Sequence, residues 1–388
     1  MADTLRIVQL NLAYAADLTS PDAVLARYHT LTGWSRAASG AGADVRVVQR
    51  FSADARIDVD DVHYHFVREG RAGVSSPWAS VPRVVSAVGA ADPDVVHVNG
   101  LMFPGVVRAL RTSLPAHVAI VLQDHSGYVP HTPSWPMKQW VTERWRRAFE
   151  AVDAVTFTAA ALSRRWREVG LDPDVAVLEI PEASTDFVAV DRTAARQETG
   201  FEGSPALLWV GRLDANKDPI SVLGGIELAR SRLPGIRCGM IYHGADIEDR
   251  VRDYVARSTG LRERVKLVGA IAHDRLPAYY SAADIFVSGS HHEGSGYALI
   301  EALACGLTPC VTDIPAFRAL TGSCGARWQP QSPAACAAAI VELAERDPVA
   351  ERSLVRRHFD HALSWDAIGR QTVGAYQALV LRRTAMVE

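Results

Sequence analysis

Two carboxylates follow a glycine-containing loop late in the chain. Glu293 lies in the run His-His-Glu-Gly-Ser-Gly at residues 291–296, and Glu301 lies eight positions further on, in a helical pattern that ends at Gly306. A glycine loop that enters a helix bares backbone N–H groups at the positive end of the helix dipole, where anions bind. Each carboxylate can accept two hydrogen bonds from vicinal hydroxyls. The segment therefore predicts a site for a phosphorylated ligand that carries hydroxyl groups.

The surroundings of Glu301 favour this interpretation over a surface role. An arbitrary pair of glutamates at this spacing would be a solvated helix residue and a partner of the helix dipole. Glu301, however, is the one charged residue in the run Ala-Leu-Ile-Glu-Ala-Leu-Ala at residues 298–304. We expect this run to be buried, and an unpaired charge there would be costly.

A second loop carries two cations. Arg212 and Lys217 lie in the run Gly-Arg-Leu-Asp-Ala-Asn-Lys-Asp-Pro at residues 211–219, which follows an expected strand and leads into an expected helix. A guanidinium group binds a phosphate with two hydrogen bonds and an ammonium group adds a point charge, so the pair suits a diphosphate. Taken singly, each would be a surface cation; the phosphate-type helix start at residue 297 makes a diphosphate site the better interpretation.

Two histidines of the N-terminal half differ in their expected roles. His125 follows the apolar run at residues 118–123, at the carboxyl end of an expected strand, where ligands of open α/β sheets bind. His97 lies inside the run Asp-Val-Val-His-Val and is expected to pack within its strand. We therefore favour His125 as the functional histidine, although most single histidines are core or surface residues.

Two other segments have simpler interpretations. The acidic and histidine-rich residues 58–65 resemble a metal site, but Val62, Tyr64 and Phe66 alternate with the histidines as in a half-exposed strand. The helical pattern at residues 135–152 carries tryptophans and basic residues, which makes a membrane-facing surface conceivable. An amphipathic helix packed on the core is the favoured interpretation.

The elements that must position these residues form two alternating series. Short β-branched runs alternate with helical patterns, which is typical of βαβ units and parallel sheets. In the first series, strands are expected at residues 5–12, 45–51, 95–98, 118–123, 154–158 and 175–180. In the second, strands are expected at residues 206–210, 238–242, 265–268, 285–287 and 309–312. The fold class is therefore α/β, with two doubly wound Rossmann-like domains.

The chain is predicted to divide near residue 188. We expect an N-terminal domain at residues 1–188, joined by the final helix at residues 368–388, and a C-terminal domain at residues 189–367. Two such domains would leave a cleft between the carboxyl ends of their sheets. The acceptor would then bind the N-terminal domain, near residues 11–20 and 127–135.

Composition excludes several classes of protein. The 388 residues carry a formal net charge of -3, which gives no overall attraction to nucleic acid or to an anionic membrane. Five cysteines without a Cys-x-x-Cys motif argue against a disulfide framework and structural zinc, and fit a reducing cytoplasm. No apolar run approaches the ~20 residues of a membrane span. The sequence predicts a cytoplasmic protein, with peripheral membrane contact conceivable but not favoured.

The two loops together resemble a known family. Gly-Arg-Leu-x-x-x-Lys-Asp at residues 211–218 and Glu-Gly-x-Gly-x-x-x-x-Glu-Ala-x-Ala-Cys-Gly at residues 293–306 resemble the retaining glycosyltransferases of family 4, which have the GT-B fold. Pro-Asp-Val-Val-His at residues 93–97 and Ala-Asp-Ile-Phe-Val at residues 283–287 support the match, which extends over nearly the whole chain.

The resemblance implies a role for each candidate. Arg212 and Lys217 would hold the diphosphate of a nucleotide sugar, Glu301 the ribose hydroxyls and Glu293 the donor hexose. His125 would face the donor sugar. Backbone N–H groups near the helix start would cap the phosphate; the residues of this loop assigned to the donor are Gly294, Ser295, Gly296, Tyr297 and Ala298.

The sequence departs from the family pattern at two places. The family often has a Gly-Gly loop after the first strand, but residues 11–16 contain no glycine. Where the family often shows Pro-Asn-Gly-Val-Asp, this chain has Pro-Glu-Ala-Ser-Thr-Asp at residues 181–186. The acceptor side of the phosphate loop and the contacts near residue 182 are therefore not assigned by the resemblance.

The function that we expect is transfer of a hexose, with retention at the anomeric carbon, from a nucleotide diphosphate sugar to an acceptor hydroxyl. A UDP-sugar is favoured and a GDP-sugar is the other choice; neither a metal nor a resident cofactor is expected. A sugar-nucleotide epimerase or hydrolase is the nearest alternative. A glycosidase that uses Glu293 and Glu301 as its two carboxylates is more distant because it leaves Arg212 and Lys217 unexplained. A non-catalytic scaffold ranks last.

Overall fold

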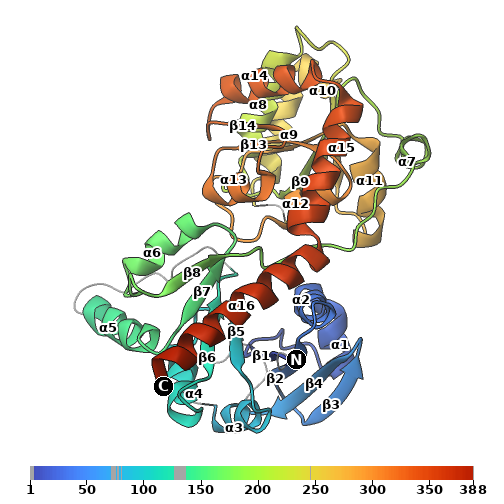
Figure 1. Cartoon of the computed structure of the whole chain (residues 1–388). Helices are drawn as coiled ribbons and strands as arrows, with labels where there is room; N and C mark the ends of the chain where they lie inside the picture. The colour runs from blue at the N-terminus through green and yellow to red at the C-terminus, as the bar shows by residue number, and fades with distance from the viewer. Residues whose placement is uncertain are drawn as a thin grey trace. The chain divides into compact units, whose positions relative to one another are not determined.

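The chain forms two compact units, each built around one sheet. A computed structural model describes residues 4–70, 76, 78–79, 81–125, 137–244 and 246–387 (Figure 1). One unit comprises Met1–Ala183 with Trp365–Glu388, and the other comprises Ser184–Ser364. Both sheets have helices packed on them, as the alternating sequence pattern predicts.

The first unit contains an eight-stranded sheet of order β3-β4-β2-β1-β5-β6-β7-β8. Neighbouring strands are parallel except in the β3–β4 hairpin. Its strands are β1 Arg6–Asn11, β2 Asp44–Phe51, β3 Ala55–Val59, β4 Val62–Arg68, β5 Val95–Asn99, β6 Ala119–Gln123, β7 Ala154–Phe157 and β8 Ala176–Glu179. Its helices are α1 Pro21–Arg27, α2 His29–Gly40, α3 Pro82–Ala90, α4 Pro104–Ser113, α5 Met137–Phe149, the 3-10 turn η1 Ala160–Leu162, α6 Ser163–Arg167 and α16 Trp365–Val387.

The β3–β4 hairpin explains the histidine-rich segment. Asp60 and Asp61 have positive φ angles of 51° and 58°, as a two-residue hairpin turn with matching twist requires. The apolar residues that alternate along β4 are buried, whereas His63 is exposed and pairs with Asp58 at 2.8 Å. The predicted half-exposed strand is confirmed.

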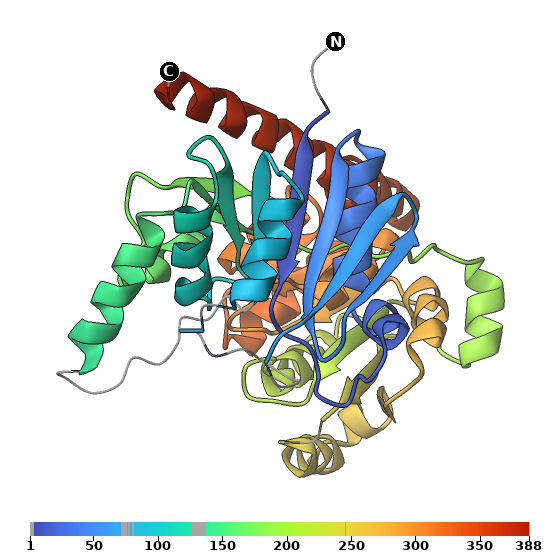
Figure 2. The same ribbon diagram turned by 90° about the horizontal axis from the view of Figure 1, so that it is seen from below.

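Helix α16 packs against α2 in this unit (Figure 2). A Cβ atom at Gly33 would lie 2.4 Å from the Trp365 ring, and one at Gly369 would lie 2.1 Å from the Ala37 carbonyl oxygen. The two helices therefore approach so closely that only glycine fits at these positions. Trp365 also belongs to the hydrophobic cluster on one face of the sheet.

The second unit contains a six-stranded parallel sheet of order β11-β10-β9-β12-β13-β14. Its strands are β9 Ala206–Arg212, β10 Arg237–His243, β11 Val265–Gly269, β12 Ile285–Ser288, β13 Thr308–Thr312 and β14 Ala326–Trp328. Its helices are α7 Arg192–Thr199, α8 Pro219–Ala229, α9 Glu248–Arg257, α10 Thr259–Arg262, η2 His273–Arg275, α11 Leu276–Ala282, α12 Tyr297–Ala304, α13 Pro315–Thr321, α14 Pro333–Ala344, α15 Pro348–His358 and the π-helical η3 Phe359–Leu363.

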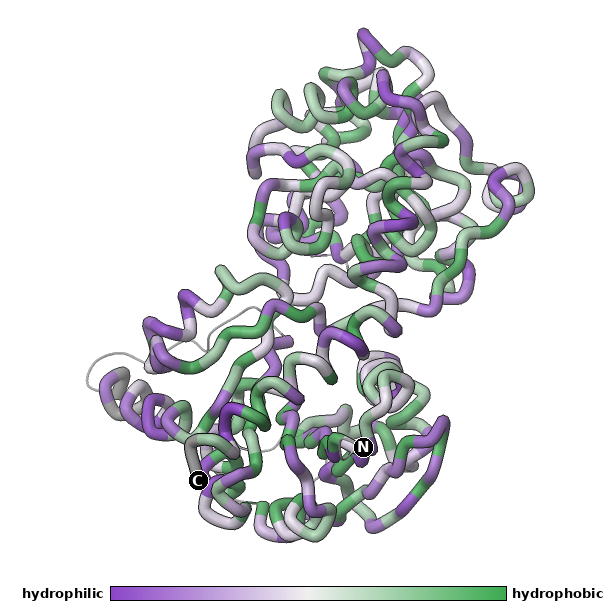
Figure 3. The backbone as a smooth tube through the Cα atoms, in the orientation of Figure 1, coloured by the Kyte–Doolittle hydropathy of each residue, from purple (hydrophilic) through white to green (hydrophobic). Residues whose placement is uncertain are grey.

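The cores lie on the faces of the sheets. Because side chains alternate along a strand, Ile7 packs into one cluster and its neighbour Val8 into the cluster on the opposite face. Hydrophobic residues accordingly concentrate in the strands, while α5 carries many hydrophilic residues (Figure 3). None of the described helices is long and apolar enough to span a bilayer.

The cysteines are all free and buried. Burial raises the pKa of the Cys238 and Cys305 thiols to about 12, so both are protonated at neutral pH. They act as small apolar residues of the core rather than as nucleophiles.

Candidate functional site

The order of the second sheet brings the two motif loops together. The chain runs from β9 outward through β10 and β11, then returns to β12 on the other side of β9. In open α/β sheets, ligands bind at the carboxyl edge where the order reverses in this way. Arg212 ends β9, and the loop with Glu293 follows β12, its neighbour. The topology therefore places the cationic loop and the glycine loop side by side.

Lys217 and Glu293 form an ion pair between these loops. The Lys217 ammonium contacts Glu293 Oε1, and both side chains are largely buried, with exposed fractions of 21% and 11%. Arg212 is 63% exposed and lies 3.2 Å from Asp214 Oδ2. The structure thus brings Lys217 to Glu293, while Arg212 extends into solvent beside the same loop.

Hydrogen bonds fix the two loops against each other. The backbone N–H of His291 donates to the Asn216 carbonyl at 2.8 Å, and the Asn216 amide donates to the His292 carbonyl at 3.0 Å. A Cβ atom at Gly289 would lie 2.7 Å from the Asp218 carbonyl oxygen, so this contact also requires glycine. These bonds hold Lys217 and Glu293 within reach of each other.

Helix α12 begins at Tyr297, directly after the glycine loop, as predicted. Gly296 is its N-cap and has a φ of 70°, and a Cβ atom there would lie 2.5 Å from Leu320 Cδ1. Gly294, Ser295 and Gly296 therefore lead directly into a helix N-terminus. The first N–H groups of a helix have no acceptor within it, and the helix dipole favours negative charge at that end.

Glu301 lies on α12 and is paired with two side chains. It accepts a hydrogen bond of 2.9 Å from Tyr280 and lies 3.1 Å from His273 Nε2, while its own side chain is 12% exposed. The hydrogen bond to Glu301, with the charge of Asp274, raises the pKa of His273 against the opposing effect of burial. The Phe187 ring lies beside that of His273, with 4.8 Å between the centroids and the ring planes tilted by 41°. The expected burial of Glu301 is confirmed, and its charge is compensated.

A surface hollow of about 310 Å³ lies beside the cationic loop. Its lining includes Asp218, His291, Arg250 and Gln331. Within it, His291 Nε2 is 3.0 Å from Asp218 Oδ2, and Asp218 also caps α8 by accepting from the Ser221 N–H. This pair ties the start of α8 to the loop after β12.

In the first unit, His125 lies just beyond the end of β6, as the sequence predicts. Its Nδ1 contacts a carboxylate oxygen of Glu182, a residue that is only 1% exposed. Burial lowers the pKa of His125, but the charge and hydrogen bond of Glu182 outweigh it, with a contribution from Asp124, so the pKa is raised. The imidazole is therefore charged over a wider pH range than that of an ordinary histidine.

His97 has a structural role, as expected. It is 1% exposed, and its two ring nitrogens lie 2.6 Å from Tyr376 Oη and 2.7 Å from Gln123 Oε1. Burial lowers the pKa of His97 to about 3, so the ring is neutral. Because Tyr376 belongs to α16, His97 also joins the last helix to the sheet.

Part of the predicted acceptor region lies outside the described residues, namely residues 127–135. In the described segment, Asn11 ends β1 and is buried, and its side chain bonds that of Asn99 at the end of β5. Trp145 and Phe149 of α5 pack into the core, which agrees with the core-packed interpretation of that helix. The side chains of Lys138 and Trp140 are outside the described set.

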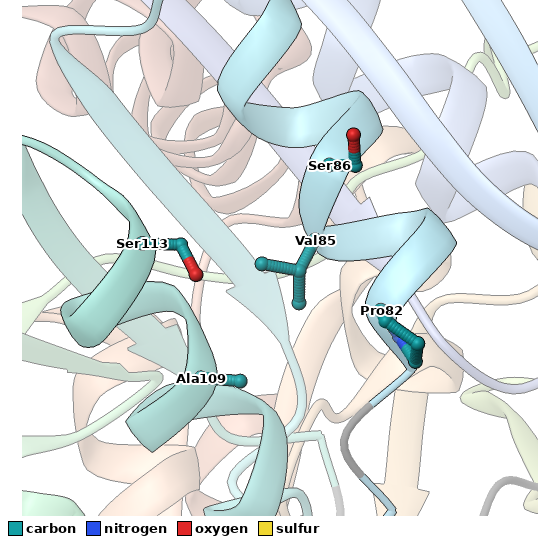
Figure 4. Close-up of a pocket in the computed structure, with 5 residues that line it drawn as sticks. All are labelled: Pro82, Val85, Ser86, Ala109 and Ser113. Atoms are coloured by element: carbon teal, nitrogen blue, oxygen red, sulfur yellow. The ribbon is translucent and has the colours of Figure 1, made fainter.

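Another hollow, of about 360 Å³, lies between α3 and α4 (Figure 4). It is lined by Pro82, Val85, Ser86, Ala109 and Ser113. Among these described residues, the polar side chains are the hydroxyls of Ser86 and Ser113, which offer no candidate chemistry. Within the described ranges, no three His, Cys, Asp or Glu side chains gather as metal ligands do.

Sequence reasoning did not identify Glu182, His273 or Tyr280 as parts of these clusters. Each lies far along the chain from the residue that it contacts, and none belongs to a motif. Only one signal was available: Glu182 occupies a position where the family often has asparagine.

Two family models match the chain, one in each half. The model described as "Glycosyltransferase Family 4" matches residues 29–179, and the one described as "Glycosyl transferases group 1" matches residues 204–346. The second includes both motif loops, at residues 211–218 and 293–306.

Curated relatives carry related names. The chain is 27% identical over 252 residues to a GDP-mannose:cellobiosyl-diphosphopolyprenol alpha-mannosyltransferase of Xanthomonas oryzae, covering 65% of this chain and 63% of that protein. It is 30% identical to a D-inositol 3-phosphate glycosyltransferase of Geodermatophilus obscurus, covering 59% of this chain and 53% of that protein. These matches span less than two thirds of the relatives' own length.

Solved structures show the fold. A sucrose-phosphate synthase of Thermosynechococcus elongatus has a TM-score of 0.68 at 21% identity, covering 97% of this chain and all of that one. An Anabaena protein, HepE, solved with UDP and glucose, has a TM-score of 0.61 at 14% identity, covering 98% of this chain and all of that one. These structures show that the chain has the GT-B fold, and the two family models show a glycosyltransferase family 4 domain in its first half and a glycosyl transferases group 1 domain in its second.

Proposed function

We propose that the chain is a hexosyltransferase that moves a hexose from a nucleotide diphosphate sugar to an acceptor hydroxyl, with retention at the anomeric carbon. The observation that carries the proposal is the pairing of Lys217 with Glu293 beside the α12 N-terminus, at the reversal point of the second sheet. An ammonium group, a guanidinium group and a helix N-terminus suit a diphosphate. A neighbouring carboxylate suits sugar hydroxyls.

In this proposal each side chain has one task. Lys217, Arg212 and the N–H groups near Tyr297 and Ala298 hold the diphosphate and stabilise the charge that it gains as it leaves. Glu293 accepts hydrogen bonds from the hexose, and Glu301 from the ribose. His125 faces the hexose and positions it.

The reaction balances without a further reactant. The bond between the anomeric carbon and the diphosphate oxygen breaks, and the acceptor oxygen bonds to the anomeric carbon on the same face. The acceptor proton passes to the departing diphosphate, and a nucleoside diphosphate is released. We propose that the second unit binds the donor and the first unit the acceptor.

The donor is proposed as a UDP- or GDP-hexose. The names of three matched relatives specify GDP-mannose, which makes it the first compound to test, together with UDP-glucose. The relatives' names also supply two acceptor classes to try, an inositol phosphate and a polyprenol-linked glycan. No metal ion is included in the proposed step.

Incubation with these sugar nucleotides, with and without acceptors, tests the proposal. Nucleoside diphosphate release that requires an acceptor supports a transferase, and equal release without one favours a hydrolase. Conversion of the donor to another hexose without release favours an epimerase. Turnover of a glycoside that lacks a nucleotide would favour the glycosidase alternative. Activity that survives a chelator supports the metal-free step.

A further inference from the structure

The first sheet has its own point where the strand order reverses. The chain passes from β1 to β2 on one side and later returns to β5 on the other side of β1. In open α/β sheets, ligands bind outside the carboxyl ends of the strands at such a point. Asn11 is the last residue of β1, and Asn99 is the last residue of β5. Two amide side chains therefore lie where the topology predicts a ligand.

The two amides are bonded to each other, but their hydrogen bonding is incomplete. The Asn99 amide donates to the side-chain carbonyl of Asn11, which is only 5% exposed. Among the described residues, Asn11 Nδ2 and Asn99 Oδ1 are buried atoms without a hydrogen-bond partner. Buried polar atoms are nearly always paired, and one that is not costs free energy. The pair thus leaves one donor and one acceptor for a group that these residues do not supply.

The neighbouring amides at the same edge differ from the central pair. Gln49 of β2 is in register with Asn11, so the two side chains share one face of the sheet. Gln123 of β6 is in register with Asn99 in the same way. Gln49 donates to a backbone carbonyl at 2.9 Å, and Gln123 Oε1 lies 2.7 Å from Nε2 of His97. The outer amides therefore bond within the chain, while the pair at the reversal point keeps two atoms unpaired.

We infer that Asn11 and Asn99 bind a hydroxyl group of a sugar or cyclitol ring, and that this ring belongs to the acceptor. The inference rests on the proposed function and deepens it by assigning side chains to the acceptor. A hydroxyl group both accepts and donates, so it can accept from Asn11 Nδ2 and donate to Asn99 Oδ1. Two neutral amides offer no charge to a phosphate, so the pair suits the ring of a ligand rather than an anionic group.

The edge is partly open to solvent where β5 ends. Asn99 is half-buried, as is the following Gly100, and Ala13 in the loop after β1 is exposed. Asn11 itself is buried. We therefore expect a ring to approach from the side of Asn99, with Asn11 at the inner end of the site.

The unpaired atoms also predict how the site affects stability. Replacing both partners of a buried polar pair by apolar groups of similar shape is nearly neutral or stabilising, because no atom is then left without a partner. The double variant Asn11→Leu/Asn99→Leu should therefore have a Tm equal to or above that of the wild type. If the pair served only to join β1 to β5, its loss would lower Tm.

The first test is binding of ring polyols to the full chain in the absence of a nucleotide sugar. The probes are myo-inositol and cellobiose, with inorganic phosphate as a competitor, and binding is followed by ligand-observed NMR. We expect at least one polyol to bind and phosphate not to displace it. The double variant should bind this polyol ~10–100-fold more weakly, because two hydrogen bonds between neutral groups are lost.

Gln9→Leu is the matched control for these measurements. Gln9 lies on the same strand and face as Asn11, is 1% exposed, and accepts a hydrogen bond of 2.6 Å from Ser35. Its replacement should lower Tm, since Ser35 loses its partner, and should leave polyol binding unchanged. If the double variant does not fold, Asn99→Leu alone gives the same comparison, because Asn99 is half-buried.

The second test is transfer with GDP-mannose or UDP-glucose as the donor and an inositol phosphate or a polyprenol-linked glycan as the acceptor. The double variant should raise the KM of the acceptor by ~10–100-fold, for the same reason. The affinity for the donor, measured by calorimetry, should not change.

The outcomes separate the inference from the proposed function. Equal polyol binding by the wild type and the double variant, or no polyol binding by the wild type, would overturn the inference. A fall in Tm of the double variant as large as that of Gln9→Leu would also overturn it. If polyols bind as expected but no donor is turned over, the proposed function fails and the site remains. If transfer occurs with an unchanged acceptor KM, the site fails and the proposed function remains.

Discussion

Lys217 and Glu293, which the family resemblance assigns to different parts of the donor, are bonded to each other in the structure. The ammonium contacts Glu293 Oε1 although 76 positions separate the two residues in the chain. A ligand diphosphate would therefore meet a lysine that already has an anionic partner. The pair links the proposed phosphate and hexose positions, and a change at either residue must affect both.

Glu293→Gln is expected to separate turnover from nucleotide binding. The substitution keeps the side-chain volume but frees Lys217 and removes a negative charge near the diphosphate. Nucleoside diphosphate should bind more tightly, while turnover should fall by ~10²-fold, the loss typical of one preorganised group at a reaction centre. Calorimetry with GDP and UDP measures the first effect and steady-state kinetics the second. Weaker nucleotide binding would contradict the hexose role of Glu293.

Lys217→Ala is expected to weaken nucleoside diphosphate binding by ~10–100-fold, since a hydrogen bond to a charged group contributes ~1.5–3 kcal/mol. Arg212→Ala should also weaken binding, but it should leave Tm unchanged because Arg212 is 63% exposed. Arg232→Ala, which removes an exposed arginine of the same unit, is the control for both. If Lys217→Ala and Arg232→Ala bound the nucleoside diphosphate with equal affinity, Lys217 would not bind the diphosphate.

The His273–Glu301 contact predicts a pH-dependent contribution to stability. Because the folded pKa of His273 is raised, the contribution is complete below its ordinary value of 6.5 and is lost as pH rises through the folded pKa. The Tm difference between the wild type and His273→Gln should therefore be larger near about pH 6 than near about pH 8.5. His243→Gln, the same change at an exposed histidine of the same unit, is the control. A Tm difference between the wild type and His273→Gln that grew with pH would be inconsistent with an ion pair between His273 and Glu301.

Two glycines of α16 should respond oppositely to the same substitution. Gly369→Ala would force a Cβ atom to within 2.1 Å of the Ala37 carbonyl oxygen and should destabilise the chain by ~1–3 kcal/mol, as overpacking does. Gly374 has open space around it, and alanine there should stabilise the helix by up to ~1 kcal/mol. Denaturant unfolding followed by circular dichroism measures both. If Gly369→Ala and Gly374→Ala changed the free energy of unfolding by the same amount, α16 would not pack on α2 as described.

Much of the fold could be predicted because buried parallel strands form apolar runs. The predicted strands correspond to β1, β2, β5–β8 and β9–β13, with ends displaced by a few residues at most. The periodicity alone left β3 unassigned because it is an edge strand with largely exposed residues, and β14 unassigned because it has only three residues. Neither has a continuous apolar run to mark it.

Only those parts of the candidate site that lie in local sequence motifs could be predicted. The loops with Lys217 and Glu293 are local motifs, and the sheet order brings them together. Tyr280, His273 and Glu182 contact their partners through tertiary packing, which no spacing in the sequence encodes. Their roles became visible only when the carboxylates and their partners could be placed in space.

The most direct test of the donor site is calorimetric titration of the wild type and Lys217→Ala with GDP-mannose and UDP-glucose. We expect the wild type to bind at least one of them and Lys217→Ala to bind it at least ~10-fold more weakly. Failure of the wild type to bind either donor, or equal binding by the two proteins, would contradict this expectation.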